Sequence, residues 1–306
     1  MAVEVSIIIP AYKAKEYLRI CLNSIKNNMP DSLEYEVIVV EDHGEDGSLE
    51  MLYDEFKWAT ILHNEVNSGL IQTRLNGVAV ASGEFIFLID SDIEMFEGTY
   101  KVLIDAMRDD ERLGFVTCNK KSFDGTHQRS HFDMPNLTQS FLSMIPYIRH
   151  QQVTKSKKDH QTTCDPGWIS PGHSLIRRSA WDDVGGQSPQ FFFYGEEIDF
   201  CYKLRKKKWH IRFLPHMGFI HYGSVSQQGD KDRFRKMSWL GALLIADLYW
   251  PRWQALVLRL LFFIRAMAIA VKMILTLQSP WDIIAFSFRI LSPNKLKNNH
   301  LNEGYT

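Results

Sequence analysis

The sequence predicts an α/β protein whose mainly parallel mixed sheet is flanked by helices and followed by an amphipathic helical extension. Short apolar runs alternate with stretches of helical periodicity, an order typical of parallel sheets covered by helices. With 306 residues, 45% of them hydrophobic, the chain is long enough to bury a sizeable core. The segment from residue 231 onward differs from the rest because it is basic and holds the longest apolar runs.

The strands and helices of the N-terminal part follow one another along the chain. Apolar runs predict strands at 5–9, 36–40, 60–62 and 85–89, and helical spacing predicts helices near 17–25, 47–56 and 70–81. The run 85–89 is wholly apolar, which is typical of a central strand covered on both faces. Since ligands bind beyond the carboxyl ends of the strands in such sheets, the loops after residues 40 and 89 are the expected binding site.

Residues 119–166 are polar and irregular, which predicts a long lid or binding loop that is partly disordered until a ligand binds. Ordered structure is expected to resume near Trp168, with helices at 179–184 and 196–209. The loop histidines have no metal-ligand spacing and are expected to face solvent; they are His127, His131, His150 and His160.

Composition excludes several classes of function. The cysteines are far apart and form no C-x-x-C pair, so neither a zinc site nor a redox motif is indicated and reduced thiols are expected. A net charge of −1 argues against a nucleic-acid binder. The N-terminal apolar run 5–9 is too short for a secretory signal, so the body of the protein is expected in the cytoplasm.

The first chemical signal is Asp90-Ser91-Asp92, directly after the wholly apolar strand. Two carboxylates at this spacing supply the hard oxygens that Mg²⁺ or Mn²⁺ needs, while substrate phosphates complete the shell. A solvated turn or a helix cap is the alternative. The position beyond a central strand favours the metal.

A second acidic pair, Glu41-Asp42, follows the strand 36–40 and is able to accept hydrogen bonds from a base or a ribose. Asp46 and Ser48, just downstream, are more simply read as caps of the next helix. On the following helix Arg74 is either a diphosphate clamp or an ordinary surface arginine.

A third acidic group, Glu196, Glu197 and Asp199, follows the aromatic run 191–194. Asp199 is explained by an i,i+4 pair with Lys203 and by the preference for acids at a helix N-terminus. Carboxylates crowded beside aromatic surface tend to have raised proton affinity, which suits Glu196 or Glu197 to general-base work.

In this order and spacing, the motifs resemble the family 2 glycosyltransferases of the GT-A fold, and the last two resemble the rhamnosyltransferase-like branch. The resemblance runs from Val5 to about Ser224. The matching pieces are Ile8–Tyr12, Val39–Asp42 with Asp46–Ser48, Asn67 and Gly69 with Arg74 and Gly77, Ser82–Phe85 leading into Asp90–Asp92, Gly172 with Arg177–Arg178, Gly185–Gly186, Phe192–Asp199 and His221–Ser224.

The resemblance implies a catalytic domain over residues 1–230, with a nucleotide-binding half at 1–118 and an acceptor half at 119–230. It also implies inverting transfer of a sugar from a dTDP- or UDP-sugar, dTDP-rhamnose among them, to a hydroxyl of a glycan or lipid-linked saccharide. The implied cofactor is a divalent cation, Mg²⁺ or Mn²⁺.

The resemblance further implies a role for each matching residue. The donor would contact Pro10, Ala11, Tyr12, Glu41, Asp42, Asn67, Gly69, Arg74, Asp90 and Ser91. The metal would bind Asp92, Asp90 and His221. Glu197 would be the base, assisted by Glu196, and the acceptor would meet Trp168, Gly172, His173 and Tyr194.

The tail 231–306 holds eleven Lys and Arg against four Asp and Glu. Its apolar stretch 239–277 is long enough to cross a bilayer, but charged residues interrupt it, and a central Arg costs about 2.5–3.5 kcal/mol. The cations at 252, 259, 265 and 272 fall within half of the helix circumference. This pattern favours a helix lying on an anionic membrane surface, at the inner face of the cell membrane, where it would meet a lipid-linked acceptor. The alternative is packing on the catalytic body or on a second subunit, as an oligomer.

Two other classes of function remain open at this level. A nucleotidyltransferase-like enzyme that acts on a metal-bound diphosphate would share the sheet and Asp90/Asp92 but would not need Glu197. A non-catalytic sugar-binding scaffold on the membrane would tolerate the loss of either acid group.

Overall fold

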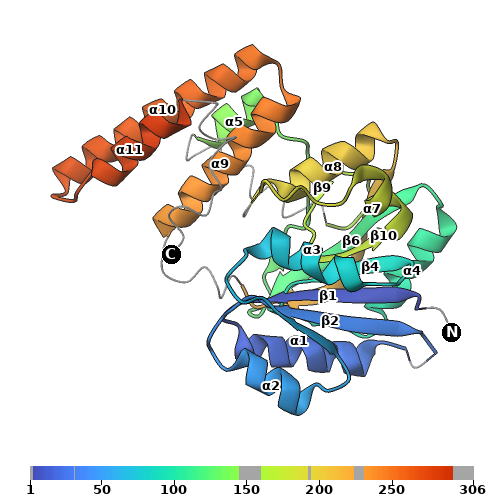
Figure 1. Ribbon diagram of the computed structural model, residues 1–306. Helices are drawn as coiled ribbons and strands as arrows, with labels where there is room; N and C mark the ends of the chain where they lie inside the picture. The colour runs from blue at the N-terminus through green and yellow to red at the C-terminus, as the bar shows by residue number, and fades with distance from the viewer. Residues whose placement is uncertain (1–2, 31, 145–159, 192–193, 224–230, 292–306) are drawn as a thin grey trace. The chain divides into compact units, whose positions relative to one another are not determined.

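The computed structural model describes residues 3–30, 32–144, 160–191, 194–223 and 231–291 (Figure 1). Outside these ranges lie Phe192, Phe193 and Ser224, which belong to the sequence motifs, and His150, one of the loop histidines. The described chain divides into two compact units. The first comprises 1–134, 153–189 and 197–228, and the second comprises 135–152, 190–196 and 229–306. The division near residue 229 lies close to the expected domain boundary, but two earlier segments also belong to the second unit.

Within the described residues, the first unit contains one nine-stranded sheet in the order β3-β2-β1-β4-β10-β6-β11-β5, with β7 paired to β6. Its parallel part consists of β1 (Val5–Ala11), β2 (Tyr35–Glu41), β3 (Thr60–His63) and β4 (Phe85–Ile89). The second part consists of β5 (Ile93–Met95), β6 (Leu113–Ser122), β7 (His127–Gln128), β10 (His173–Arg177) and β11 (His210–His221). There β6 and β11 run parallel, whereas the other pairs are antiparallel. The predicted α/β fold and its first four strands are confirmed.

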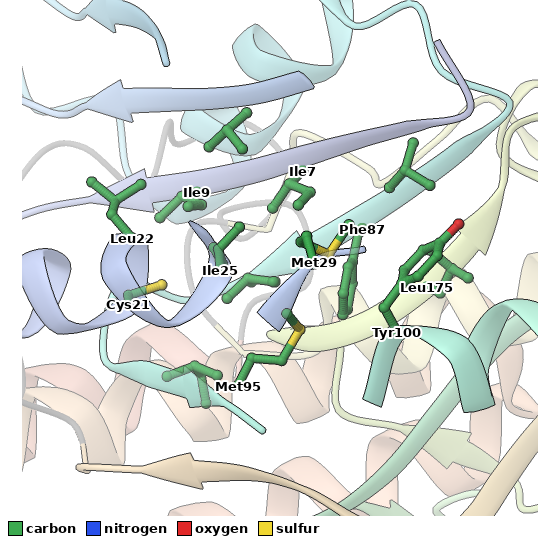
Figure 2. Packing of buried hydrophobic residues seen from close by; sticks show 14 of the residues in the cluster. Ile7, Ile9, Cys21, Leu22, Ile25, Met29, Phe87, Met95, Tyr100 and Leu175 are labelled. Atoms are coloured by element: carbon green, nitrogen blue, oxygen red, sulfur yellow. The ribbon is translucent and has the colours of Figure 1, made fainter. Parts of the chain in front are cut away.

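Two layers of helices cover the sheet of the first unit. One face packs against α1 (Lys15–Asn28), α2 (Ser48–Glu55) and α4 (Thr99–Asp109). Figure 2 shows part of this core, where Leu22 and Ile25 of α1 lie against Ile7 and Ile9 of β1. The other face packs against α3 (Leu70–Val80), α7 (Arg178–Val184) and α8 (Glu196–Lys206).

One glycine brings α3 close to the sheet. A Cβ on Gly77 would lie 2.6 Å from Ile8 Cγ2, so any larger residue would push the helix away from β1. Arg74 lies one turn earlier and is also a buried residue of this helix.

The described parts of the region expected to be an irregular loop, 119–144 and 160–166, contain more regular structure than predicted. Strand β6 continues to Ser122, and β7, β8 (His131–Phe132) and α5 (Leu137–Ser143) follow it. The expectation that the histidines face solvent is wrong for His131, which is buried and lies against Phe213, ring centroids 4.0 Å apart. His127 is half-buried and stacks on His160. The polar residues of these strands led composition to suggest a loop. Their pairing with other strands cannot be read from composition.

The second unit has its own apolar core, built by α9 (Lys231–Tyr249), α10 (Arg252–Leu275) and α11 (Trp281–Ile290). The cations of α10 do not form one exposed face, which corrects the sequence interpretation. Arg259 is 1% exposed, binds the Asp247 carboxylate and donates to the Ile290 carbonyl oxygen. None of the helices in the described ranges combines the length and apolarity that a membrane span requires.

Candidate active site

Asp90 is held at the carboxyl end of β4 by partners from two other elements. Its N–H donates to the Gly172 carbonyl oxygen (2.8 Å), and its Oδ1 accepts from Arg74 Nη2 (2.7 Å). A Cβ on Gly172 would lie 1.8 Å from Asp90 Oδ2, so only glycine allows this carboxylate position. Arg74, 1% exposed on α3, therefore anchors Asp90 here and is not an ordinary surface arginine.

Asp92 directly precedes β5, and His221 is the last residue of β11, the strand that pairs with β5. Strand β5 pairs with β11 so that Ile93 faces His221, and the Tyr222 N–H donates to the Asp92 carbonyl oxygen (3.0 Å). The pairing brings His221 Nε2 to 3.3 Å from Asp92 Oδ2. The two residues are far apart in the sequence, and only the strand pairing joins them.

These side chains can be compared with the ligands that a divalent cation needs. In the described residues, no group of three or more His, Cys, Asp or Glu side chains is arranged to hold a metal ion. Asp90 is bound to Arg74. Asp92 and His221 nevertheless provide two ligand atoms 3.3 Å apart, close to the separation of about 3 Å between adjacent ligands in an octahedral shell with bonds of about 2.1 Å. Mg²⁺ and Mn²⁺ sites commonly take their remaining ligands from substrate phosphates and water. The pair therefore fits a cation that is bound together with a diphosphate.

Lys120 is a buried lysine near Asp90 and Asp92. The sequence interpretation did not include it in the site. Lys120 lies in β6 and is 8% exposed. Burial lowers the pKa of Lys120, and the Asp90 and Asp92 carboxylates partly oppose this shift. The residues Phe115, Val116 and Thr117, which favour strands, could have indicated a strand that continues to this lysine.

Glu41, the last residue of β2, and Asp42, which follows it, already accept hydrogen bonds from other groups of the protein. Asp42 accepts from Asn64 Nδ2 (2.8 Å), the Ser68 N–H (2.8 Å) and the Gly69 N–H (3.0 Å). Glu41 accepts from the Gly44 N–H (2.6 Å), the His43 N–H (3.1 Å) and His63 Nδ1 (2.8 Å). A carboxylate accepts about four hydrogen bonds, so most of this capacity is already used to fix the loops beyond β2 and β3.

The other residues that were expected to contact the nucleotide-sugar lie along the same edge of the sheet. Pro10 and Ala11 end β1, and Tyr12 is half-buried beside Lys13, whose Nζ is 5.2 Å from the ring centroid. Asn67 is exposed and its Oδ1 accepts from the Gly69 N–H (3.1 Å). Ser91 is half-buried between β4 and β5.

The expected acceptor residues have different surroundings. Trp168, in β9 (Trp168–Ile169), is half-buried and stacks on Phe132 with ring centroids 4.1 Å apart. His173 is fully buried and its Nε2 lies 3.1 Å from Ser130 Oγ; burial lowers the pKa of His173 well below its ordinary value. That position argues against direct contact between His173 and an acceptor. Tyr194 is half-buried in the second unit.

The third acidic group lies at the start of α8, where the chain passes from the second unit to the first. Glu196 is 4% exposed and belongs to the second unit, whereas the half-buried Glu197 belongs to the same unit as Asp92. Asp199 accepts from Ser188 Oγ (2.6 Å) and lies 3.5 Å from Lys203 Nζ, which confirms its structural role.

The sheet order, with acids at the carboxyl ends of β2 and β4 on either side of β1, defines an α/β protein of the GT-A type, and solved glycosyltransferases share this fold. GalNAc-T7, solved with UDP, GalNAc and Mn²⁺, aligns with TM-score 0.61 at 17% identity, over 83% of this chain and 49% of that one. Staphylococcus aureus TarS in complex with UDP-GlcNAc aligns with TM-score 0.54 at 20% identity, over 80% of this chain and 67% of that one.

The chain belongs to glycosyl transferase family 2, whose family model matches residues 6–185. Polypeptide N-acetylgalactosaminyltransferase 5 of Caenorhabditis elegans is 24% identical over 216 residues, which cover 65% of this chain and 34% of that protein. N-acetylglucosaminyl-diphospho-decaprenol L-rhamnosyltransferase of Mycobacterium tuberculosis is 25% identical over 154 residues, covering 48% of this chain and 50% of that protein. The chain thus spans between a third and a half of the length of these two relatives.

Proposed function

We propose that this chain is an inverting glycosyltransferase that moves a sugar from a nucleoside diphosphate donor to a hydroxyl of a glycan or lipid-linked saccharide. The observation that carries the proposal is the Asp92–His221 pair beyond β4 and β11, in a chain of glycosyl transferase family 2. Two similar structures were solved with UDP or UDP-GlcNAc, and one relative is named as a rhamnosyltransferase. These similarities support a UDP- or dTDP-sugar as the donor.

In this proposal, Asp92 and His221 hold a divalent cation, and Asp90 with Ser91 lies toward the donor ribose. When bound, the cation stabilises negative charge that develops on the leaving diphosphate. Arg74 keeps Asp90 in one orientation, and Gly172 leaves room for its carboxylate. Lys120 is buried beside the two aspartates, and its amine and the two carboxylates interact electrostatically. The protein thus orients the diphosphate before any bond breaks.

Glu197 is the proposed base. An acceptor hydroxyl attacks the anomeric carbon from the face opposite the diphosphate, and a carboxylate within about 2.6–3.2 Å must take its proton. A single displacement inverts the anomeric centre and needs one such base. Trp168 and Gly172, which belong to the same unit as Glu197, are proposed to border the acceptor.

The test measures release of nucleoside diphosphate from UDP- and dTDP-sugars, with EDTA or with added Mg²⁺ or Mn²⁺. Asp92→Asn and Glu197→Gln are expected to lower the rate at least about 100-fold, because each removes a group that acts in the transition state. Asp54→Asn and Glu50→Gln, on exposed side chains of α2, are matched controls and should keep the wild-type rate. Full activity of either site variant would refute its role, and release of inorganic diphosphate would indicate a nucleotidyltransferase instead.

We further propose that the second unit binds an anionic membrane surface at the inner face of the cell membrane. Helix α10 contains no acidic residue, and its exposed side chains are mostly apolar. They include Trp253, Leu256, Leu260, Ile264, Val271 and Ile274. Exposed cations, Arg252 and Lys272, lie near its two ends. An apolar face flanked by cations matches the chemistry of an anionic bilayer.

Vesicle sedimentation tests this second part. Ile264→Glu, at a side chain 61% exposed, should reduce binding to phosphatidylglycerol vesicles, whereas Val66→Glu, at a side chain 66% exposed in the first unit, should not. Equal binding of both variants would contradict a membrane role for α10. Loss of a dimer in solution on Ile264→Glu, without any vesicle binding by the wild type, would identify the face as a contact between two copies instead.

A further inference from the structure

We propose that Gln128 is a positioning residue that sets which nitrogen of His221 is available to the divalent cation. This inference rests on the proposed function, because it concerns the Asp92–His221 pair. Gln128 belongs to none of the motifs that resemble the family, and it lies in a segment that the sequence suggested was an irregular loop. Only the strand pairing brings it to the site.

Gln128 and His221 meet because their strands lie on either side of β6. Gln128 of β7 pairs with Lys120, and His221 of β11 pairs with Ser122. Gln128 reaches across β6, and its Oε1 lies 2.6 Å from His221 Nδ1. Both side chains are half-buried, so little water competes for the contact.

The orientation of the Gln128 amide follows from its other neighbours. Its Nε2 donates to Ser122 Oγ (2.6 Å) and approaches the His221 carbonyl oxygen (3.4 Å). A carbonyl oxygen only accepts, so the amide nitrogen belongs on that side and the amide oxygen faces His221. Nδ1 must therefore carry the hydrogen of the neutral imidazole.

The consequence appears at the other ring nitrogen. With the hydrogen on Nδ1, Nε2 of the neutral ring has a free lone pair, and this lone pair faces Asp92 Oδ2 at 3.3 Å. Two lone pairs at this distance repel each other, and a cation between them is stabilised by both. In the other tautomer, the Nε2 hydrogen would bond to Asp92 and occupy both metal ligands at once.

Removal of the amide should therefore weaken metal binding without any change to a ligand. Partners that orient a metal-ligating histidine typically contribute 10–100-fold to metal affinity. Gln128→Leu removes the acceptor for Nδ1–H and lets the competing tautomer form. Gln128→Glu keeps an acceptor oxygen at the same place and should retain the affinity.

The test measures Mn²⁺ binding in the presence of UDP, because the pair takes its remaining ligands from a diphosphate; free Mn²⁺ is followed by its electron paramagnetic resonance signal, and binding of Mn²⁺ to UDP without protein is subtracted. Gln128→Leu should raise the Kd for Mn²⁺ by about 10–100-fold. Gln128→Glu and the control Gln72→Leu, on the exposed part of α3, should stay near the wild type. If Gln128→Leu does not fold, as judged by circular dichroism, Gln128→Met makes the same test. An unchanged Kd in the folded Leu or Met variant overturns the proposal.

A double-variant cycle separates positioning from a general structural effect. On a His221→Ala background, Gln128→Leu should cause no further loss of Mn²⁺ affinity, and an additional loss of the same size would refute the proposal. ¹⁵N NMR of the His221 ring should show hydrogen on Nδ1 in the wild type and more hydrogen on Nε2 in Gln128→Leu.

The cycle also distinguishes this inference from the proposed function. If Asp92→Asn and His221→Ala leave the Kd for Mn²⁺ unchanged, the metal site itself is wrong and both proposals fail. If those variants lose Mn²⁺ while Gln128→Leu keeps it, only the role of Gln128 is refuted.

Discussion

Replacement of Arg259 by methionine should strongly destabilise the second unit. Its guanidinium is 1% exposed, binds the Asp247 carboxylate and donates to the Ile290 carbonyl oxygen. Methionine fills much of the same space but leaves Asp247, whose side chain is only 12% exposed, without its counter-ion. Removal of one partner of a buried ion pair costs about 3–5 kcal/mol. The Ile290 carbonyl loses a donor, which adds about 1 kcal/mol.

The double variant Arg259→Met with Asp247→Leu makes this estimate testable. Replacement of both charges by apolar groups of similar volume is often neutral, so the double variant should recover most of the lost free energy of unfolding. Urea unfolding followed by tryptophan fluorescence measures both values, since Trp239 belongs to the same core. Arg252→Met, at an exposed position of α10, is the control and should change the stability by less than about 0.5 kcal/mol. A loss below about 1 kcal/mol in the single variant, or a double variant no more stable than the single one, would refute the reasoning.

Further predictions concern the first unit. Gly172→Ala should lower the melting temperature and weaken donor binding measured by calorimetry, because the new Cβ displaces Asp90 from Arg74; unchanged binding would contradict this. Ellman's reagent at pH 8 should modify the native protein first at Cys164, since the other three cysteines are buried, and mass spectrometry identifies the site. Burial raises the pKa of Glu36, but hydrogen bonds from two serines outweigh it and leave the pKa below its ordinary value. Glu36→Gln should therefore lower thermal stability at pH 7, with a difference that shrinks as the pH falls below about 4.3 through the folded pKa.

Local sequence was sufficient for the parallel half of the sheet. The strands at 5–9 and 85–89 are wholly apolar or nearly so, and helical spacing follows the first and precedes the second, so their type and order were predicted correctly. The strands after residue 89 were missed. Among them, the strand segments that contain Lys120 and Gln128 are polar, and their pairing depends on partners across the sheet. Composition cannot distinguish such strands from a loop.

The candidate site shows the same limit. Sequence motifs selected Asp90, Asp92 and His221, and their joint role in metal binding stays a prediction. No motif indicated that Arg74 would bind Asp90, or that Glu41 and Asp42 would accept hydrogen bonds from other groups of the protein. These contacts depend on the distance between α3 and β4 and on the loops beyond β2.

The sequence by itself determined the alternation of strands and helices, the family and the identity of the acidic groups, because each of these is written in residues that are neighbours along the chain. Only the tertiary structure decided that Gln128 meets His221, 93 residues away, and that Arg259 is buried against Asp247. Strand register and helix packing place such side chains together, and both arise from hydrophobic burial over the whole unit, which no short segment specifies.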